Sequence, residues 1–276
     1  MLLQEIEEAF YRSWSCVLSK NKICASFFIL FLCSCLVMAY QIFSLFLYSW
    51  MLSYVALFFI SVCVALLFFL GIVLSRMHGC DRNRIEINFR RSCSAFSEVA
   101  FLIIYLITPI FFFCVLCRIL LGSFWLLTEI PIIGPFAEVI CGFIPFVLIF
   151  YIFCMGIFIL VSLFYVTPHI ALKTENKIDL PREMWMRWKC HLFVNILFFI
   201  ISISPFLCFS AILLYAFFVT ETIYLSPHAF FAFVLQKFFI MIPFALFLTP
   251  CIIFFFHFST ESLLLWRKGE RMESHM

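Results

Sequence analysis

The sequence predicts an all-α, polytopic membrane protein with six transmembrane helices. Of its 276 residues, 66% are hydrophobic and only 12% are charged, whereas soluble domains carry roughly 25% charged residues. The segment 23–75 contains no Asp, Glu, Lys or Arg. Because ~20 helical residues cross the hydrocarbon core of a bilayer, this segment is too long for one span and fits two.

The first 22 residues are predicted to form a cytoplasmic helix at the membrane surface. Phe10 and Trp14 fall at helical spacing, opposite the charged residues Glu8 and Arg12, which is typical of an interfacial amphipathic helix. The start of the chain is acidic, and the apolar run that follows continues far beyond any cleavage point. We therefore expect an uncleaved first span rather than a signal peptide.

Six apolar segments follow, and no polar block is long enough for a separate domain, so residues 1–276 are predicted to form one integral membrane domain. The expected spans are about 24–46, 51–74, 99–117, 139–166, 192–219 and 238–258. Prolines lie in the last four spans and are absent from the first two (Pro109, Pro145, Pro205, Pro243 and Pro250). Because proline kinks a helix, the first two spans should form a straight hairpin and the later spans should bend.

The distribution of Lys and Arg predicts the orientation. With six spans and both termini in the cytoplasm, 16 of the 18 basic residues fall on the inner side, and Arg118 and Lys237 fall outside. Cytoplasmic loops are enriched in Lys and Arg. Five or seven spans would place a basic segment on the outer side.

Short segments before the first, third and fifth spans resemble one another. In each, an acidic residue precedes an aromatic residue, and an arginine lies two positions beyond the aromatic (Glu8, Phe10 and Arg12; Glu86, Phe89 and Arg91; Glu183, Trp185 and Arg187). One interpretation is a three-fold repeat of helix hairpins. The alternative is that basic and aromatic residues are needed wherever a span begins on the cytoplasmic side, without any repeat. On either interpretation, Arg12, Arg90, Arg91 and Arg187 are expected to contact anionic headgroups rather than nucleic acid.

The segment Ala9-Phe10-Tyr11-Arg12-Ser13-Trp14 resembles the opening of certain uncharacterised six-span bacterial inner-membrane proteins. The segment 166–172, which leads into a charged loop, is similar to their central cytoplasmic segment. This resemblance implies a helical fold in the bacterial inner membrane. It supplies no reaction, cofactor or site.

Candidate functional residues are few, because ionisable groups inside a membrane are costly and usually functional. His257 lies within the sixth span, where it has either a proton-handling role or, as we favour, a neutral packing role with hydrogen bonds. Glu98 and Glu261 are placed at inner boundaries, within reach of water. The external segment 119–138 combines Arg118, Glu129 and Glu138 with glycines and prolines. It is either a re-entrant loop or, as we favour, a surface helix with a turn.

No catalytic motif is recognisable, and neither a cofactor nor a metal site is expected. His78, Cys80 and Cys93 lack the spacing and number of zinc ligands. We therefore expect a non-enzymatic structural or interaction component of the membrane, with the lipid bilayer and either a membrane-protein partner or a second copy as its contacts. The alternative is a transporter or permease for a small solute or lipid that uses the kinked spans.

Overall fold

The computed structural model describes residues 2–46, 49–83, 134–172, 192–223 and 230–273, together with five single residues between 108 and 119. Every element in these ranges is an α-helix: α1 (Leu2–Ser15), α2 (Lys20–Phe46), α3 (Ser49–Asn83), α5 (Gly134–Leu172), α7 (Leu192–Ile223) and α8 (Phe230–Glu273). Five of them, all except α1, are long and apolar enough to cross a membrane. For these residues, the prediction of an all-helical protein with several membrane-spanning helices is thus confirmed. The predicted third span, 99–117, lies outside the described residues apart from single positions.

The helices extend beyond the predicted spans. Helix α3 continues to Asn83 and α8 to Glu273, beyond the predicted span ends at residues 74 and 258. A helix bonds its own backbone, so it need not end where the hydrocarbon ends. Helix α5 begins at Gly134, so the last residues of the external segment belong to this helix. Pro135 lies in its first turn, where the missing N–H is tolerated.

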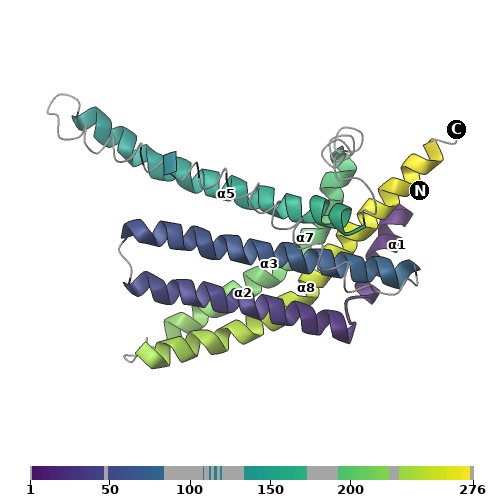
Figure 1. Cartoon of the computed structure of the whole chain (residues 1–276), viewed down its shortest axis with the longest axis horizontal. Coiled ribbons are helices and arrows are strands. Elements are labelled where there is room, and N and C mark those ends of the chain that lie inside the picture. The colour runs from purple at the N-terminus through teal and green to yellow at the C-terminus, as the bar shows by residue number, and fades with distance from the viewer. Residues whose placement is uncertain are drawn as a thin grey trace.

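Helix α8 is the central element of the bundle. It packs against α1, α2, α3, α5 and α7 (Figure 1). Every residue from 251 to 263 is buried, including the large side chains of Phe254, Phe256 and Phe258. Because this part of α8 is buried on every side, other helices surround it.

Helices α3 and α5 run side by side in the same direction. Gly71 of α3 lies against Thr167 of α5, and nearer their C-terminal ends the Arg76 Nε donates a hydrogen bond to the Ala171 carbonyl (3.4 Å). Figure 1 shows α8 running in this direction as well, while α2 and α7 run in the opposite direction. Three parallel helices therefore meet at the end of the bundle where α1 lies.

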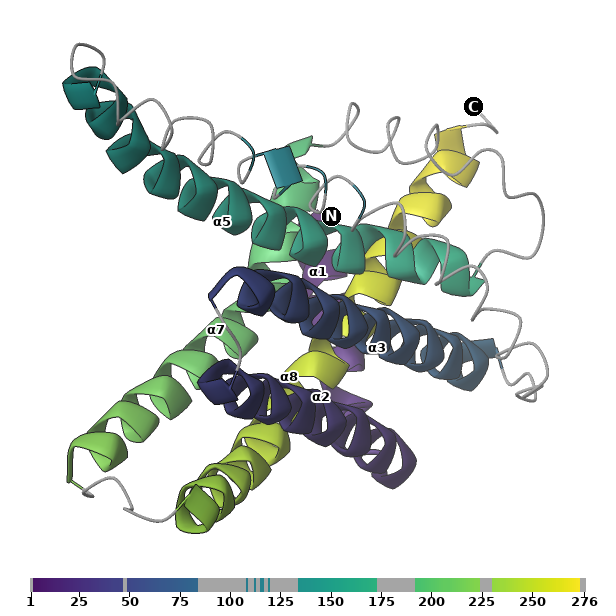
Figure 2. The same cartoon turned by 60° about the vertical axis from the view of Figure 1, so that its left-hand side comes forward.

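The buried core is concentrated at that end. Helices α5 and α7 diverge from the bundle towards their other ends (Figure 2), where many of their apolar side chains are exposed (Phe143, Phe150, Phe153 and Phe158 in α5; Leu207, Ile212, Leu214 and Phe218 in α7). In a membrane these side chains face lipid tails, which are as apolar as they are. Helix α1 closes the packed end, because Phe10 and Trp14 contact Phe254 at ring-centroid distances of 5.3 Å and 5.8 Å.

Helix α1 is the predicted N-terminal helix, with two differences from expectation. It ends at Ser15, and a turn separates it from α2, so residues 1–22 do not form one continuous helix. Ala9 and Ser13 of this helix are buried where it packs on α8, and Val17 in the following turn is buried as well.

Candidate functional site

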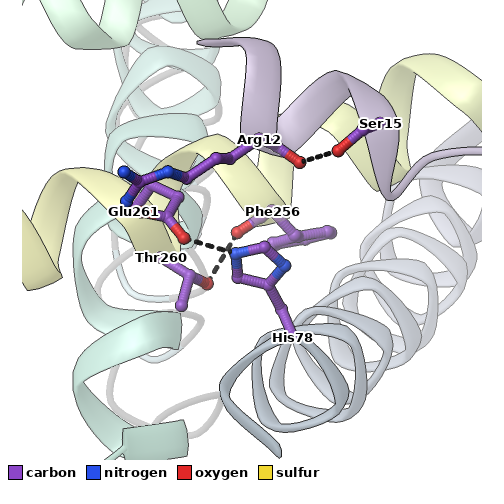
Figure 3. Close-up of polar contacts among 6 residues, drawn as sticks. All are labelled: Arg12, Ser15, His78, Phe256, Thr260 and Glu261. Carbon is purple, nitrogen blue, oxygen red and sulfur yellow. Dashed lines mark hydrogen bonds and ion pairs between the residues drawn. The ribbon is translucent and has the colours of Figure 1, made fainter. Parts of the chain in front are cut away.

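Four ionisable side chains are buried together at the packed end of the bundle, and we call Lys22, His78, His257 and Glu261 the polar cluster. The Nε2 of His78 on α3 lies 2.8 Å from the Oε1 of Glu261 on α8 (Figure 3), and these side chains are 5% and 2% exposed. The rings of His78 and His257 stack with centroids 4.6 Å apart. Burying such groups is expensive unless they are paired.

The geometry of α8 brings two members of the cluster onto one face. His257 and Glu261 are four positions apart, which is about one helical turn, so their side chains are neighbours. The intervening hydroxyls are used internally: the Thr260 Oγ1 donates to the Phe256 carbonyl at 2.8 Å (Figure 3), and the Ser259 Oγ donates to the Phe164 carbonyl of α5. The first bond lies within α8, and the second connects α8 to α5.

The close approach of α3 to α8 brings His78 to the cluster. Gly71 is two turns before His78, and a Cβ built at Gly71 would lie only 2.4 Å from the Cε1 of Phe256. Glycine is therefore required for this crossing, since small residues let helix backbones approach closely. Without it, α3 would move away and His78 would lose contact with Glu261.

Helices α1, α2 and α5 complete the surroundings. Lys22 of α2 is 2% exposed and lies within electrostatic range of His257, as does the backbone of Ser13 on α1. His169 of α5 is buried, with its ring tilted against Trp266 at a centroid distance of 6.3 Å. Polar groups from five helices thus gather at one end of an otherwise apolar bundle.

Several buried polar atoms in this region have no hydrogen-bond partner among the described residues. They are Nδ1 of His78, both ring nitrogens of His257, and the hydroxyls of Ser13, Ser26, Ser75 and Thr167. Buried polar atoms are nearly always bonded in native proteins, and exceptions point to functional groups or small bound species. The free imidazole nitrogens can accept a proton or a hydrogen bond. No grouping suitable for a metal ion occurs in the described part of the chain.

His257 is the predicted candidate that falls in this site. It is fully buried and stacks on a second histidine, and the choice of a packing role over a proton-handling role stays a prediction. The expectation that Glu261 reaches water is wrong, because this residue is 2% exposed and its carboxylate lies against His78 of α3. His78 and Lys22 were not selected from the sequence. The four-residue spacing of His257 and Glu261, within an apolar helix, was the available signal.

The other predicted site residues are not brought to the cluster by the described part of the structure. Arg12 lies on α1 with its side chain half exposed and pairs with Glu8 at 2.7 Å, so its contact with headgroups stays a prediction. Glu138 lies near the start of α5. The remaining candidates lie outside the described residues (Arg90, Arg91, Arg118, Glu129 and Arg187).

Comparisons with models of known protein families, with curated proteins and with solved structures found no match to this chain.

Proposed function

We propose that this protein is a multi-pass membrane transporter for a small solute, and that the polar cluster lies at its moving part. The observation that carries this proposal is the buried contact between His78 of α3 and Glu261 of α8. Ionisable side chains within a membrane bundle are expensive to keep and typically mark a path for ions or solutes. A purely structural bundle would be more stable with apolar groups at these positions.

The distribution of proline supports movement of α8. Pro243 and Pro250 lie inside this helix, just before its buried part, and Pro205 lies inside the neighbouring α7. Each proline removes a backbone hydrogen bond and favours bending. The packed segment 251–263 and the preceding part of α8 can therefore tilt relative to each other by bending at Pro243 and Pro250. Rocking of one helix group against another is the common basis of alternating access.

Flux measurements test this proposal. The purified chain in liposomes should take up at least one member of a broad panel of labelled small solutes faster than empty liposomes do. Glu261→Gln should slow that uptake by about tenfold or more, since a hydrogen bond to a charged group is worth about 1.5–3 kcal/mol. Arg12→Gln, which alters an exposed pair, is the matched control. Absence of uptake across the panel, or equal uptake by Glu261→Gln, would refute the proposal.

We also propose six spans, with both termini in the cytoplasm of a bacterial cell and the protein in the inner membrane. The parallel course of α3 and α5 supports this, because two parallel spans need a crossing between them and the predicted span 99–117 lies between them in sequence. The concentration of Lys and Arg in a few segments supports the orientation.

A three-fold repeat of helix hairpins gains support from the three parallel helices. Ser75, Thr167 and Ser259 lie 92 residues apart in the sequence and occupy the buried ends of α3, α5 and α8. A buried His or Glu follows each of them by two or three positions (His78, His169 and Glu261). An experimental structure tests the repeat: the segment 99–117 should pack antiparallel to α5, as α2 packs on α3 and α7 on α8.

A structural or interaction role is the second candidate, and the apolar outer faces of α5 and α7 favour it. A membrane-protein partner or a second copy would bury these faces beside lipid. Purification after mild extraction tests this role: a fixed partner or a stable oligomer, lost when Phe150 and Phe153 are replaced by alanine, would support it. A monomer without partners would exclude it.

A further inference from the structure

We propose that His78, His257 and Glu261 form a binding site for a single proton, and that this proton is the coupling ion of transport. The coupling role rests on the proposed function. The binding of the proton does not, because it follows from the geometry of the three side chains and can be measured without any solute.

The site has a donor, an acceptor and a free basic nitrogen in one contact. A neutral His78 that donates its Nε2 hydrogen to the Glu261 carboxylate across 2.8 Å keeps a lone pair on Nδ1, and no described atom is bonded to Nδ1. A proton from water adds to this lone pair and forms one N–H bond. The product is an imidazolium that faces a carboxylate, so the hydrogen bond becomes a charge-assisted ion pair.

A second proton is excluded by the position of His257. Its ring stacks on His78 at 4.6 Å, so two imidazolium rings would repel each other strongly in a buried site. Lys22 adds a positive charge within range of His257. His257 therefore stays neutral, and the proton is held on His78, beside the carboxylate.

The groups on the packed helices reinforce this assignment. Among the described residues, α7 contributes the neutral Asn195 at this end, and its backbone carbonyl accepts a hydrogen bond from the Tyr165 hydroxyl. The charge of Arg12 on α1 is directed to Glu8 at the exposed surface. The other titratable or charged groups near the cluster are Lys22 of α2, Arg76 of α3, bonded to the Ala171 carbonyl, and His169 of α5, against Trp266. Among the acidic residues that the structure describes, Glu261 is thus the one whose carboxylate contacts an imidazole ring.

Proton binding would act on the contact between α3 and α8. With the proton bound, an ion pair joins the two helices. When the proton leaves, a weaker neutral–ionic hydrogen bond remains. The proline positions in α8 lie directly before this contact, so a weaker contact frees the buried segment of α8 to tilt. Protonation and helix movement are thereby linked, as coupling requires.

A difference titration of the full chain in a non-ionic detergent tests the stoichiometry. Protons taken up between pH 10 and pH 4 are counted for the wild type and for variants, and groups common to both cancel. We expect His257→Gln to take up the same number of protons as the wild type, and His78→Gln/Glu261→Gln to take up one fewer. The carboxylate is removed together with the imidazole, because a buried Glu261 without its partner would itself bind a proton in this range. His275→Gln, near the C-terminus, is the control that removes one ordinary histidine.

The role of Glu261 is tested by repeating the comparison in a Glu261→Gln background, where His78→Gln should no longer change the count. A difference of two protons, or of none, between the wild type and His78→Gln/Glu261→Gln would overturn the one-proton site. Should a variant fail to elute as a folded species, ¹⁵N spectra of labelled histidines in the wild type decide the question. Two doubly protonated rings, or none, at these positions at pH 5 would also overturn it. Flux without this stoichiometry would leave the transporter proposal standing, and the stoichiometry without flux would leave the proton site standing.

Discussion

Replacing Gly71 with alanine should destabilise the bundle, although the change adds a single methyl group. The new Cβ would lie 2.4 Å and 2.7 Å from two ring atoms of Phe256 and 2.6 Å from the Cγ2 of Thr167. Phe256 is 2% exposed and Thr167 is fully buried, so neither side chain has space into which to move. The α3–α8 crossing must widen to accommodate the methyl group.

The expected loss follows from the usual effect of overpacking. Extra methyl groups in a well-packed core cost about 1–3 kcal/mol. One kcal/mol shifts the midpoint of thermal unfolding by about 2–4 °C in chains of this size class. Gly71→Ala should therefore lower the midpoint, measured by tryptophan fluorescence in detergent, by several degrees. Because His78 lies two turns further along α3, the variant should also reduce uptake in the liposome assay.

Two other glycines serve as matched controls. A Cβ at Gly156 of α5 meets nothing within 4 Å, and one at Gly79 meets the end of the Leu172 side chain at 2.8 Å. Gly156→Ala should leave the midpoint unchanged or raise it, because alanine is the better helix former by about 1 kcal/mol. Gly79→Ala should fall between the two, since a side-chain end can rotate away. A Gly71→Ala protein as stable as Gly156→Ala would refute the close crossing of α3 and α8.

Three further predictions concern the packed end and the topology. His78→Ala and Glu261→Ala should each lower the free energy of unfolding by about 2 kcal/mol. The double variant should lose less than the sum, because both substitutions remove the same contact, and strict additivity would contradict the pairing. Tyr165→Phe should lower the free energy of unfolding by about 1 kcal/mol, because it removes the 2.6 Å hydrogen bond to the Asn195 backbone carbonyl. Tyr215 is exposed, so Tyr215→Phe should leave the free energy of unfolding unchanged. Equal stability of the two variants would contradict that bond. Single cysteines kept at Cys16, Cys80, Cys93 or Cys190 should react with an impermeant thiol reagent only after permeabilisation, and reaction in intact cells would contradict the cytoplasmic assignment.

The spans were predictable because membrane residence is a property of local composition. Hydrophobic length fixes where a helix can cross a bilayer, and five of the six predicted segments correspond to described helices. Their ends were less predictable. The apolar run stops near Ser75, yet α3 continues to Asn83, because contacts with α5 and α8 support helix beyond the hydrocarbon.

The candidate site was predicted in part. His257 was recognisable as an ionisable residue within a span. Its partner His78 lies 179 positions earlier, at the edge of a charged loop, where a histidine usually faces water. Glu261 also lies just beyond the end of a predicted span, where an acidic residue usually faces water. No local pattern shows that a glycine two turns before His78 allows α3 to approach α8.

The sequence by itself determined that this chain resides in a membrane and where five of its apolar helices lie. These properties depend on the transfer of each residue between water and lipid, which composition records directly. Tertiary structure decided which polar residues meet. Inside the bilayer, helices have no hydrophobic drive to associate, so close packing and polar contacts choose the neighbours. The contact of His78, His257 and Glu261 depends on the relative rotation and spacing of α3 and α8, and three-dimensional packing sets both.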